Sequence, residues 1–268
     1  MSIQALYTAA TGMTSLQNKL DVTANNLANS QTVGFKRDRA NFEDLFYRTE
    51  KFPGAQDSAS QYTPVGIQYG TGSRVQSVQS DFTQGSYQTT GGQLDVAISG
   101  NGFFQIMDPS GTIYYTRAGN FSKNATGDIV LASANIGRKL EPTVSIPTDA
   151  QDIVISPEGA ISIRLPTSQQ LQQIGQFQLV SFVNPQGLLK IGENLYQQTD
   201  ASGAPAVTAN PGQQGLGLLQ QNTLEQSNVQ PVQELLDLIT TQRSFEMNSQ
   251  AVKAADDILQ TIDNLPRF

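Results

Sequence analysis

The sequence contains no histidine, no cysteine and no tryptophan among its 268 residues. Without histidine or cysteine, a Cys/His zinc site, a Ser-His-Asp triad, a cysteine nucleophile, haem ligation and an iron–sulfur cluster are excluded. No disulfide bond can form either, so stability has to come from packing and pairing. Catalysis by carboxylate, lysine or tyrosine, or by an oxygen-ligated metal, stays open, but we expect no cofactor.

Charged residues are scarce as well. They make up 15% of the chain, against about 25% in an average globular domain, and neutral amide and hydroxyl side chains take their place. The 16 Lys and Arg against 23 Asp and Glu give a net charge of −7, which argues against nucleic-acid binding. A weakly charged surface has little electrostatic self-repulsion, which favours close packing between subunits. An ordinary polar, soluble protein is the alternative.

Long hydrophobic runs are also missing. No run approaches the ~20 apolar residues of a membrane-spanning helix, so we expect no membrane insertion. The first twenty residues do not resemble a cleaved secretory signal, because their apolar residues are spaced and the first basic residue is Lys19. These features predict a cytoplasmic protein, or one that leaves the cell by a route without a cleaved signal.

Both ends of the chain show the heptad spacing of coiled-coil helices. Near the N-terminus the spaced apolar residues are Leu6, Ala10, Met13, Leu20, Ala24 and Leu27. Near the C-terminus the residues that recur every seven positions are Leu238, Phe245, Val252 and Leu259. Gly34 follows the first pattern, while Pro231 and Pro266 bound the second.

The C-terminal pattern predicts a helix over residues 231–265, which would be ~50 Å long at 1.5 Å per residue. Such a long helix with one narrow apolar stripe needs a partner helix, and the N-terminal helix is the nearest candidate. We therefore predict a coiled coil of the two terminal helices, which neighbouring subunits can share. Two amphipathic helices lying on a globular core are the alternative. The predicted subunit-interface residues are Leu6, Met13, Leu20, Leu27, Phe35, Leu238, Phe245, Val252 and Leu259.

The middle of the chain is typical of antiparallel β-structure. Residues 108–111, 156–159 and 184–187 each place Asp, Ser or Asn first, Pro second and Gly fourth, which is the preference of a type I turn. Short apolar runs flank each of them, so the pattern predicts three hairpins, and residues 124–127 predict another turn. The expected fold class is α+β: terminal helices in a coiled coil and a central, mainly antiparallel β domain.

Three parts of the chain are expected. Residues 1–35 and 227–268 would form the terminal helical domain, and residues 75–226 the central β domain. Residues 36–74 would form an extended arm or linker. Its stretch 46–69 has no hydrophobic period and contains two prolines, so it can be disordered alone and become ordered in the groove of a partner. An ordinary long loop is the alternative.

No catalytic motif stands out, and we expect no enzyme. Residues 100–102 (GNG) lack the remaining glycine, lysine and hydroxyl residues of a phosphate loop, so they are better interpreted as a β-bend. Adjacent carboxylates at residues 43–44 and 256–257 lie on arm-like or helical segments. The densest basic cluster, residues 36–39 (KRDR), would ordinarily be solvated. Phe35 before it adds an apolar anchor, which fits an interface.

Motifs along the whole chain resemble those of the bacterial flagellar rod and hook family. Those near the N-terminus are ANNLANS at residues 24–30 and GFKR at residues 34–37. Those near the C-terminus are SNV at residues 227–229 and QRSFEMNS at residues 242–249. Those in the middle are GNGFFQ at 100–105, YTRAGNF at 115–121 and GENLY at 192–196. The departures from the family pattern include residues 134–140, which are longer and more basic than the usual link.

The resemblance implies a structural subunit that polymerises helically into the rod of the flagellar basal body. This drive shaft would cross the periplasm and transmit torque to the hook. Within the family, the size of the chain and its arm are most similar to the subunits of the distal rod. A proximal rod subunit of similar size is the alternative.

The resemblance also implies partners and a location. The partners would be further copies of the chain, proximal rod proteins, the hook protein, the L and P ring proteins as a bushing, the rod cap and the flagellar type III export apparatus. Export would occur without a cleaved signal peptide, and the subunit would reside in the basal body within the periplasmic space. Two functions of other classes stay open: a secreted β-rich binding module, and a glycan hydrolase with two facing carboxylates.

Overall fold

The computed structural model describes residues 3–54, 56, 62, 64–133, 135–166 and 168–263. The chain divides into two compact units. The first, here called the helical unit, comprises Met1–Ala28, Asp38–Gln79 and Gln230–Phe268. The second, the β unit, comprises Asn29–Arg37 and Ser80–Val229.

These boundaries differ from the predicted ones. The sequence pattern grouped residues 29–35 with the helices and treated residues 36–74 as a separate arm. In the structure, residues 34–37 are hydrogen-bonded to residues 225–228 and therefore belong to the β unit. Residues 38–79 belong to the helical unit, where the strand that begins at Asp38 packs beside the N-terminal helix.

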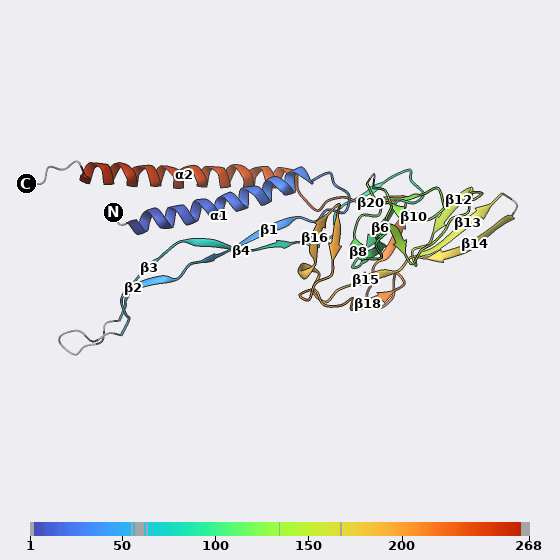
Figure 1. Ribbon diagram of the computed structural model, residues 1–268, viewed down its shortest axis with the longest axis horizontal. Helices are drawn as coiled ribbons and strands as arrows, with labels where there is room; N and C mark the ends of the chain where they lie inside the picture. Colours follow the sequence, from blue (N-terminus) through green and yellow to red (C-terminus); the bar gives the residue numbers. More distant parts are fainter. Residues whose placement is uncertain are drawn as a thin grey trace, which may run out of the picture. The chain divides into compact units, whose positions relative to one another are not determined.

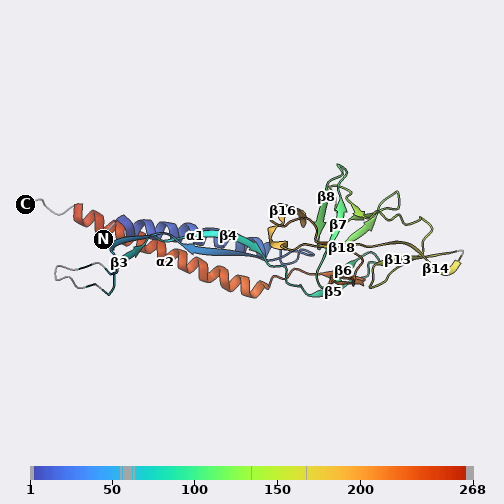
Figure 2. The ribbon, with the colours of Figure 1, turned by 90° about the horizontal axis from the view of Figure 1, so that it is seen from below.

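Two long helices dominate the helical unit. Helix α1 (Ile3–Ala28) and helix α2 (Pro231–Asp263) lie side by side and run in opposite directions (Figures 1 and 2). Near one end, the Nδ2 atom of Asn26 donates a 3.3 Å hydrogen bond to the carboxylate of Glu234. Farther along, a Cβ atom on Gly12 would lie 3.2 Å from Nδ2 of Asn248. Both terminal helices are therefore confirmed, while their supercoiling stays a prediction.

The start of α2 follows its sequence. Pro231 occupies the first helical position, where its missing N–H group costs nothing. Glu234 lies in the first turn, where a carboxylate interacts favourably with the helix dipole. The backbone N–H of Glu234 donates to the carbonyl of Gln230 at 3.0 Å. The predicted last two residues of this helix, 264 and 265, lie outside the described residues.

The arm of the helical unit contains the strands β1 (Asp38–Asp44), β2 (Tyr47–Lys51), β3 (Ile67–Gly70) and β4 (Ser73–Ser80). The sequence did not predict the first three, whereas β4 lies mostly in the predicted β region that began at residue 75. β1 pairs with β4, and β2 pairs with β3 in antiparallel fashion. All four residues of β3 are exposed. Both faces of β2 and β3 therefore meet solvent, so no alternation of apolar and polar residues marks these strands in the sequence.

The largest sheet of the β unit has nine strands among the described residues. Its order is β16-β17-β8-β7-β11-β10-β9, with β15 pairing both β7 and β18. Its strands are β7 (Phe103–Met107), β8 (Ile113–Thr116), β9 (Phe121–Lys123), β10 (Ile129–Leu131), β11 (Lys139–Glu141), β15 (Leu179–Ser181), β16 (Leu189–Gly192), β17 (Leu195–Gln197) and β18 (Val207–Ala209). The pairs are antiparallel, as predicted.

Smaller sheets complete the β unit (Figure 1). One has the order β12-β13-β14, and two are strand pairs, β19 with β6 and β20 with β5. Their bounds are β5 (Tyr87–Thr89), β6 (Val96–Ser99), β12 (Asp152–Ile155), β13 (Ala160–Leu165), β14 (Ser168–Gln176), β19 (Leu218–Gln221) and β20 (Thr223–Glu225).

Three of the four predicted turns connect paired strands. Residues 108–111 join β7 to β8, residues 124–127 join β9 to β10, and residues 156–159 join β12 to β13. The hairpin predicted at residues 184–187 is wrong, because Pro185–Gly187 form a short 3-10 helix and β15 does not pair with β16.

The physical reason lies in the partners of this turn. The Nδ2 atom of Asn184 donates to the carbonyl of Ala201 at 3.1 Å, and the Thr199 hydroxyl donates to the carbonyl of Gly187 at 2.6 Å. These bonds tie the turn to a distant loop. β15 is instead paired by β7 and β18.

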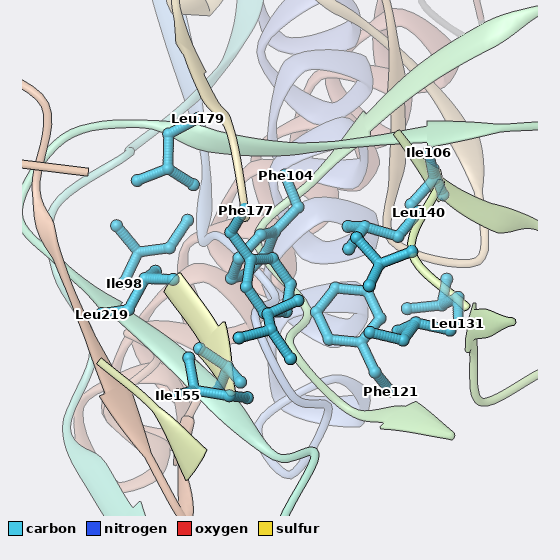
Figure 3. Packing of buried hydrophobic residues seen from close by; sticks show 14 of the residues in the cluster. Ile98, Phe104, Ile106, Phe121, Leu131, Leu140, Ile155, Phe177, Leu179 and Leu219 are labelled. Atoms are coloured by element: carbon cyan, nitrogen blue, oxygen red, sulfur yellow. The ribbon is translucent and has the colours of Figure 1, made fainter. Parts of the chain in front are cut away.

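The core of the β unit is built around three phenylalanine rings (Figure 3). Phe104 and Phe121 meet edge to face with centroids 5.1 Å apart, and Phe177 lies 5.9 Å from each of them. Such geometry is favoured by the ring quadrupoles. Aliphatic side chains from several sheets surround the rings: Ile98, Ile106, Leu131, Leu140, Ile155, Leu179 and Leu219. A second cluster gathers Phe103, Tyr115, Phe182 and Tyr196.

Gly119 allows two segments of the β unit to approach closely. A Cβ atom there would collide with the carbonyl oxygen of Val96, whose own N–H donates to the carbonyl of Gly119 at 3.0 Å. Because backbone would have to move, we predict that Gly119→Ala lowers the free energy of unfolding by about 2–3 kcal/mol or more. Gly91→Ala is the control, since its Cβ would meet nothing within 4 Å. Urea unfolding followed by circular dichroism measures both, and equal losses would contradict the prediction.

Candidate assembly surfaces

One face of α2 is turned toward α1 of the same chain. Its buried and half-buried positions recur at alternating steps of four and three along the helix: Glu234, Leu238, Thr241, Phe245, Asn248, Val252, Ala255 and Leu259. Since α2 packs against α1, this inward face contacts α1 within one subunit. It includes all four interface residues predicted on α2. On α1, the predicted residues Leu6, Met13, Leu20 and Leu27 are half-buried too.

The opposite side of α2 carries exposed apolar side chains. At 100° per residue, they lie about half a turn from the inward face, and we call them the outer stripe: Val232, Leu235, Leu236, Ile239 and Met247. Their exposed fractions range from 45% for Ile239 to 74% for Val232. Exposed apolar side chains that gather along one side of a helix indicate an interaction surface. The heptad pattern in the sequence did not indicate this second apolar face.

The arm presents a second exposed surface. Phe46, between β1 and β2, is 94% exposed. Its backbone is nevertheless held, because the Thr71 hydroxyl donates to the carbonyl of Phe46 at 2.7 Å and the N–H of Leu45 donates to the carbonyl of Gly72 at 2.9 Å. Gly72 has a φ of +118°, and a Cβ there would collide with the hydroxyl oxygen of Thr11. The arm is thus fixed against α1 at this point while it displays an aromatic ring.

A cavity beside this point opens between the arm and α1. It has a volume of about 390 Å³ and is lined by residues that include Thr11, Thr14, Leu45 and Val75. The hydroxyl of Ser15, also in its lining, donates to the carbonyl of Ser73 at 3.0 Å. The helical unit therefore has both an exposed aromatic ring, that of Phe46, and a cavity beside α1.

Phe35 and Lys36 do not lie on an open surface, so the expected solvation of the basic cluster at residues 36–39 is wrong for Lys36, while Arg39 is exposed as expected. Phe35 is only 8% exposed, and the Nζ atom of Lys190 lies 5.1 Å from its ring centroid. Lys36 is completely buried. Both side chains are therefore covered by the β unit of their own chain, and a role of Phe35 at a subunit interface stays untested.

Lys36 belongs to a buried ion cluster with Glu225 and Arg117. One Glu225 oxygen accepts hydrogen bonds from Nζ of Lys36 at 2.7 Å and from the N–H of Gly85 at 3.0 Å. The other oxygen accepts from Nε of Arg117 at 3.1 Å. Arg117 also donates to the carbonyls of Gly100 and Gly102, at 2.9 and 2.6 Å. The predicted β-bend at residues 100–102 thus supplies acceptors for a buried guanidinium group.

The pKa of Glu225 is set by opposing influences. Burial is the largest of them and would raise this pKa, but the charges of Arg117 and Lys36, together with the hydrogen bond from Lys36, outweigh it. The pKa of Glu225 therefore lies below its ordinary value. The carboxylate is charged at neutral pH and compensates two buried cations.

Residues 135–140 are anchored by a second ion group. Arg138 is 8% exposed and pairs with Asp108 at 3.0 Å and with Glu193. Nδ2 of Asn135 also donates to Glu193, at 3.2 Å. This basic departure from the family pattern thus connects the turns that follow β7 and β16.

Among the residues that the structure describes, no group of three or more Asp, Glu, His or Cys residues comes together in a way that could hold a metal ion. None of the described helices is both long and apolar enough to cross a membrane. The carboxylate of Glu43, one of the adjacent pair noted in the sequence, is bound to Arg74.

Comparison with known proteins points to one family along the whole chain. Residues 6–36 match the family described as flagella basal body rod protein, residues 97–163 match the flagellar hook protein FlgE/F/G D1 domain, and residues 220–265 match the C-terminal region of the flagellar basal body rod FlgEFG proteins.

Curated relatives extend over nearly the full length. The chain is 46% identical to the flagellar basal-body rod protein FlgG of Caulobacter vibrioides, over 98% of this chain and 99% of that protein. It is 43% identical to FlgG of Buchnera aphidicola subsp. Baizongia pistaciae, over 98% of this chain and 100% of that protein. The rod protein FlgF of Caulobacter vibrioides is 34% identical, over 90% of this chain and 89% of that protein.

The ion cluster makes the stability of the β unit depend on pH. Because the folded state lowers the pKa of Glu225, its contribution is fully present above the unfolded pKa of about 4.3 and is lost as pH falls through the folded pKa. At pH 7, Glu225→Gln should cost about 3–5 kcal/mol, since it leaves two buried cations without a counter-charge. Below about pH 4, the difference between the two proteins should shrink, because protonation makes the native side chain neutral as well.

Urea unfolding between neutral and strongly acid pH checks this prediction. Asp152→Asn is the matched control, because Asp152 forms an ion pair with Arg164 in which both side chains are about half exposed. Exposed pairs contribute little to stability, so this variant should unfold like the native chain at every pH. A difference between Glu225→Gln and the native chain that stays constant with pH would refute the role of the Glu225 charge.

Proposed function

The chain belongs to the flagellar basal-body rod and hook protein family, and we propose that it polymerises helically into the distal rod. A structural subunit of the basal-body rod is the function that its relatives share by name. Near-complete matches carry the name FlgG, whereas the FlgF relative is less identical over less of the chain. This ordering supports a place in the distal rod over the proximal alternative. It also leaves the hydrolase and the secreted binding module without support.

The outer stripe of α2 is the observation that carries the proposal. Its five side chains are apolar and yet remain exposed in the subunit. Burying one leucine of this kind contributes about 1.5–3 kcal/mol, so contact with another copy would stabilise a polymer. A contact between two different surfaces that does not close on itself generates a helical filament rather than a ring.

The inward face has a supporting part in this proposal. Leu238, Phe245, Val252 and Leu259 hold α2 against α1, and Leu6, Met13, Leu20 and Leu27 are the residues proposed to complete the pair. The pair then acts as one rigid element that presents the outer stripe. In the assembled rod it would line the inner tube, with the β unit outside.

The arm is proposed to bridge neighbouring copies and stiffen the shaft. Its anchor is Phe46, which is held by Thr71 and almost fully exposed. A rod stiffened in this way would cross the periplasm and transmit torque to the hook. The remaining partners would be the proximal rod proteins, the hook protein, the L and P ring proteins and the rod cap. The type III export apparatus would deliver the chain without a cleaved signal peptide, and no catalytic step is needed.

Substitutions on the two faces of α2 separate assembly from folding. We predict that Leu236→Asp, on the outer stripe, abolishes polymerisation but leaves the urea midpoint of the monomer unchanged. Leu238→Asp, on the inward face, should lower that midpoint as well, because it places a charge in the helix pair. Polymerisation is measured by sedimentation of purified protein and by swarming of a strain that carries only the variant.

Gln242→Asp is the control for added charge, since Gln242 is exposed and lies about a quarter turn from the centre of the outer stripe. It should polymerise normally. The proposal fails if Leu236→Asp assembles like the native chain, or if Gln242→Asp blocks assembly to the same extent.

A further inference from the structure

Three motifs that are distant in the sequence meet in one buried place of the β unit. Lys36 comes from GFKR, Arg117 from YTRAGNF, and Glu225 lies two residues before SNV. All three residues are at most 4% exposed. The proposed assembly surfaces make no use of the ion cluster that these three residues form.

Two residues of this cluster, Lys36 and Glu225, lie close in the sequence to points where the chain passes from one unit to the other. The chain passes between its two units four times, at residues 28–29, 37–38, 79–80 and 229–230. Within the β unit, the residues next to these four points fall in only three short segments: residues 29–37, 80–85 and 225–229. The ion cluster and its neighbours connect all three segments to one another.

Glu225 makes the first set of connections. Its carboxylate binds Nζ of Lys36 and the N–H of Gly85, so one side chain touches both other segments. Its own carbonyl accepts from the N–H of Gly34 at 2.8 Å. Lys36 closes the set by donating to the carbonyl of Thr83 at 2.7 Å.

Asn228 makes a second, uncharged set. Its Oδ1 atom accepts from the N–H of Arg37 at 2.7 Å, and its Nδ2 atom donates to the carbonyl of Asp81 at 2.8 Å. The N–H of Asp81 in turn donates to the carbonyl of Arg37 at 2.8 Å. One amide side chain thus joins the same three segments, within three residues of Glu225.

We propose that these three segments form a force-transmitting clasp, in which Glu225 and Asn228 lock all four chain passages to a single point of the β unit. A force applied to either terminal helix would then be carried by the clasp as a whole. It would not act on the individual strands of the β unit in turn. Arg117 anchors the clasp to the carbonyls of Gly100 and Gly102. The mechanical role rests on the proposed place in a torque-carrying rod, but the lock is a property of the isolated chain.

Hydrogen exchange of the unassembled chain tests the lock. The clasp amides are those of Gly34, Arg37, Asp81 and Gly85, and the amides of Phe177 and Leu219 serve as references in the core. Glu225→Gln should speed exchange at the clasp amides by about 100-fold beyond the acceleration that its loss of global stability produces at the references. Equal acceleration at both sets, or no acceleration at the clasp, would overturn the proposal, because Glu225 would then be an ordinary core residue or of no importance.

Asn228→Ala supplies an independent test that does not leave a charge unpaired. It should speed exchange at Arg37 and Asp81 by about tenfold, with the core references unchanged. Asn184→Ala is the matched control, since Asn184 also donates from its side chain to a distant carbonyl but lies outside the clasp. If Asn184→Ala accelerates the clasp amides as much as Asn228→Ala does, the lock does not exist.

Single-molecule pulling tests the load. Because the chain has no cysteine, handles can be attached at introduced ones: Gln31→Cys with Gln230→Cys across the clasp, or Thr112→Cys with Glu158→Cys between two turns elsewhere in the β unit. All four positions are exposed. Asn228→Ala should lower the rupture force on the first axis and not on the second. A loss of force on both axes or on neither contradicts the clasp, whether or not the chain forms the distal rod.

Discussion

The β unit depends on a carboxylate that compensates two buried cations. Glu225 is nearly inaccessible, and it holds Lys36 and Arg117 within hydrogen-bonding distance. Taking three charges out of water is costly, and only the dense set of hydrogen bonds around them makes the arrangement tolerable. Each partner comes from a different part of the chain, so the cluster forms only when those parts are in place. It therefore specifies the fold at the segments where the chain enters and leaves the β unit.

A second constraint is that α2 is apolar on two sides. The inward face is satisfied by α1 in the same chain, whereas the outer stripe stays exposed in the described subunit. A helix of this length with one exposed apolar side gains free energy from a further partner. The subunit is thus folded and still keeps an exposed apolar surface, as the proposed polymerisation requires. The scarcity of charged residues removes the repulsion that would oppose such packing.

Several elements could be predicted because their signals are local. The heptads that contain Leu20 and Val252 predicted the two helices, and the Pro-Gly spacing of residues 108–111 and 156–159 predicted two hairpins. The same spacing at residues 184–187 failed, since hydrogen bonds tie that turn to another loop. The strands of the arm were missed because both faces of β2 and β3 meet solvent.

The amino-acid sequence by itself determined which chemistry is absent, where the long helices lie and that the middle is antiparallel β-structure. These follow from composition and from periods that span only a few residues. Only the tertiary structure decided that Lys36 is buried, that the stripe of Leu238 is covered by α1 of the same chain while Leu236 stays exposed, and that Glu225 joins Lys36 to Arg117. The physical reason is that burial and charge pairing depend on residues up to 189 positions apart, and no local pattern records which distant segment will cover a side chain.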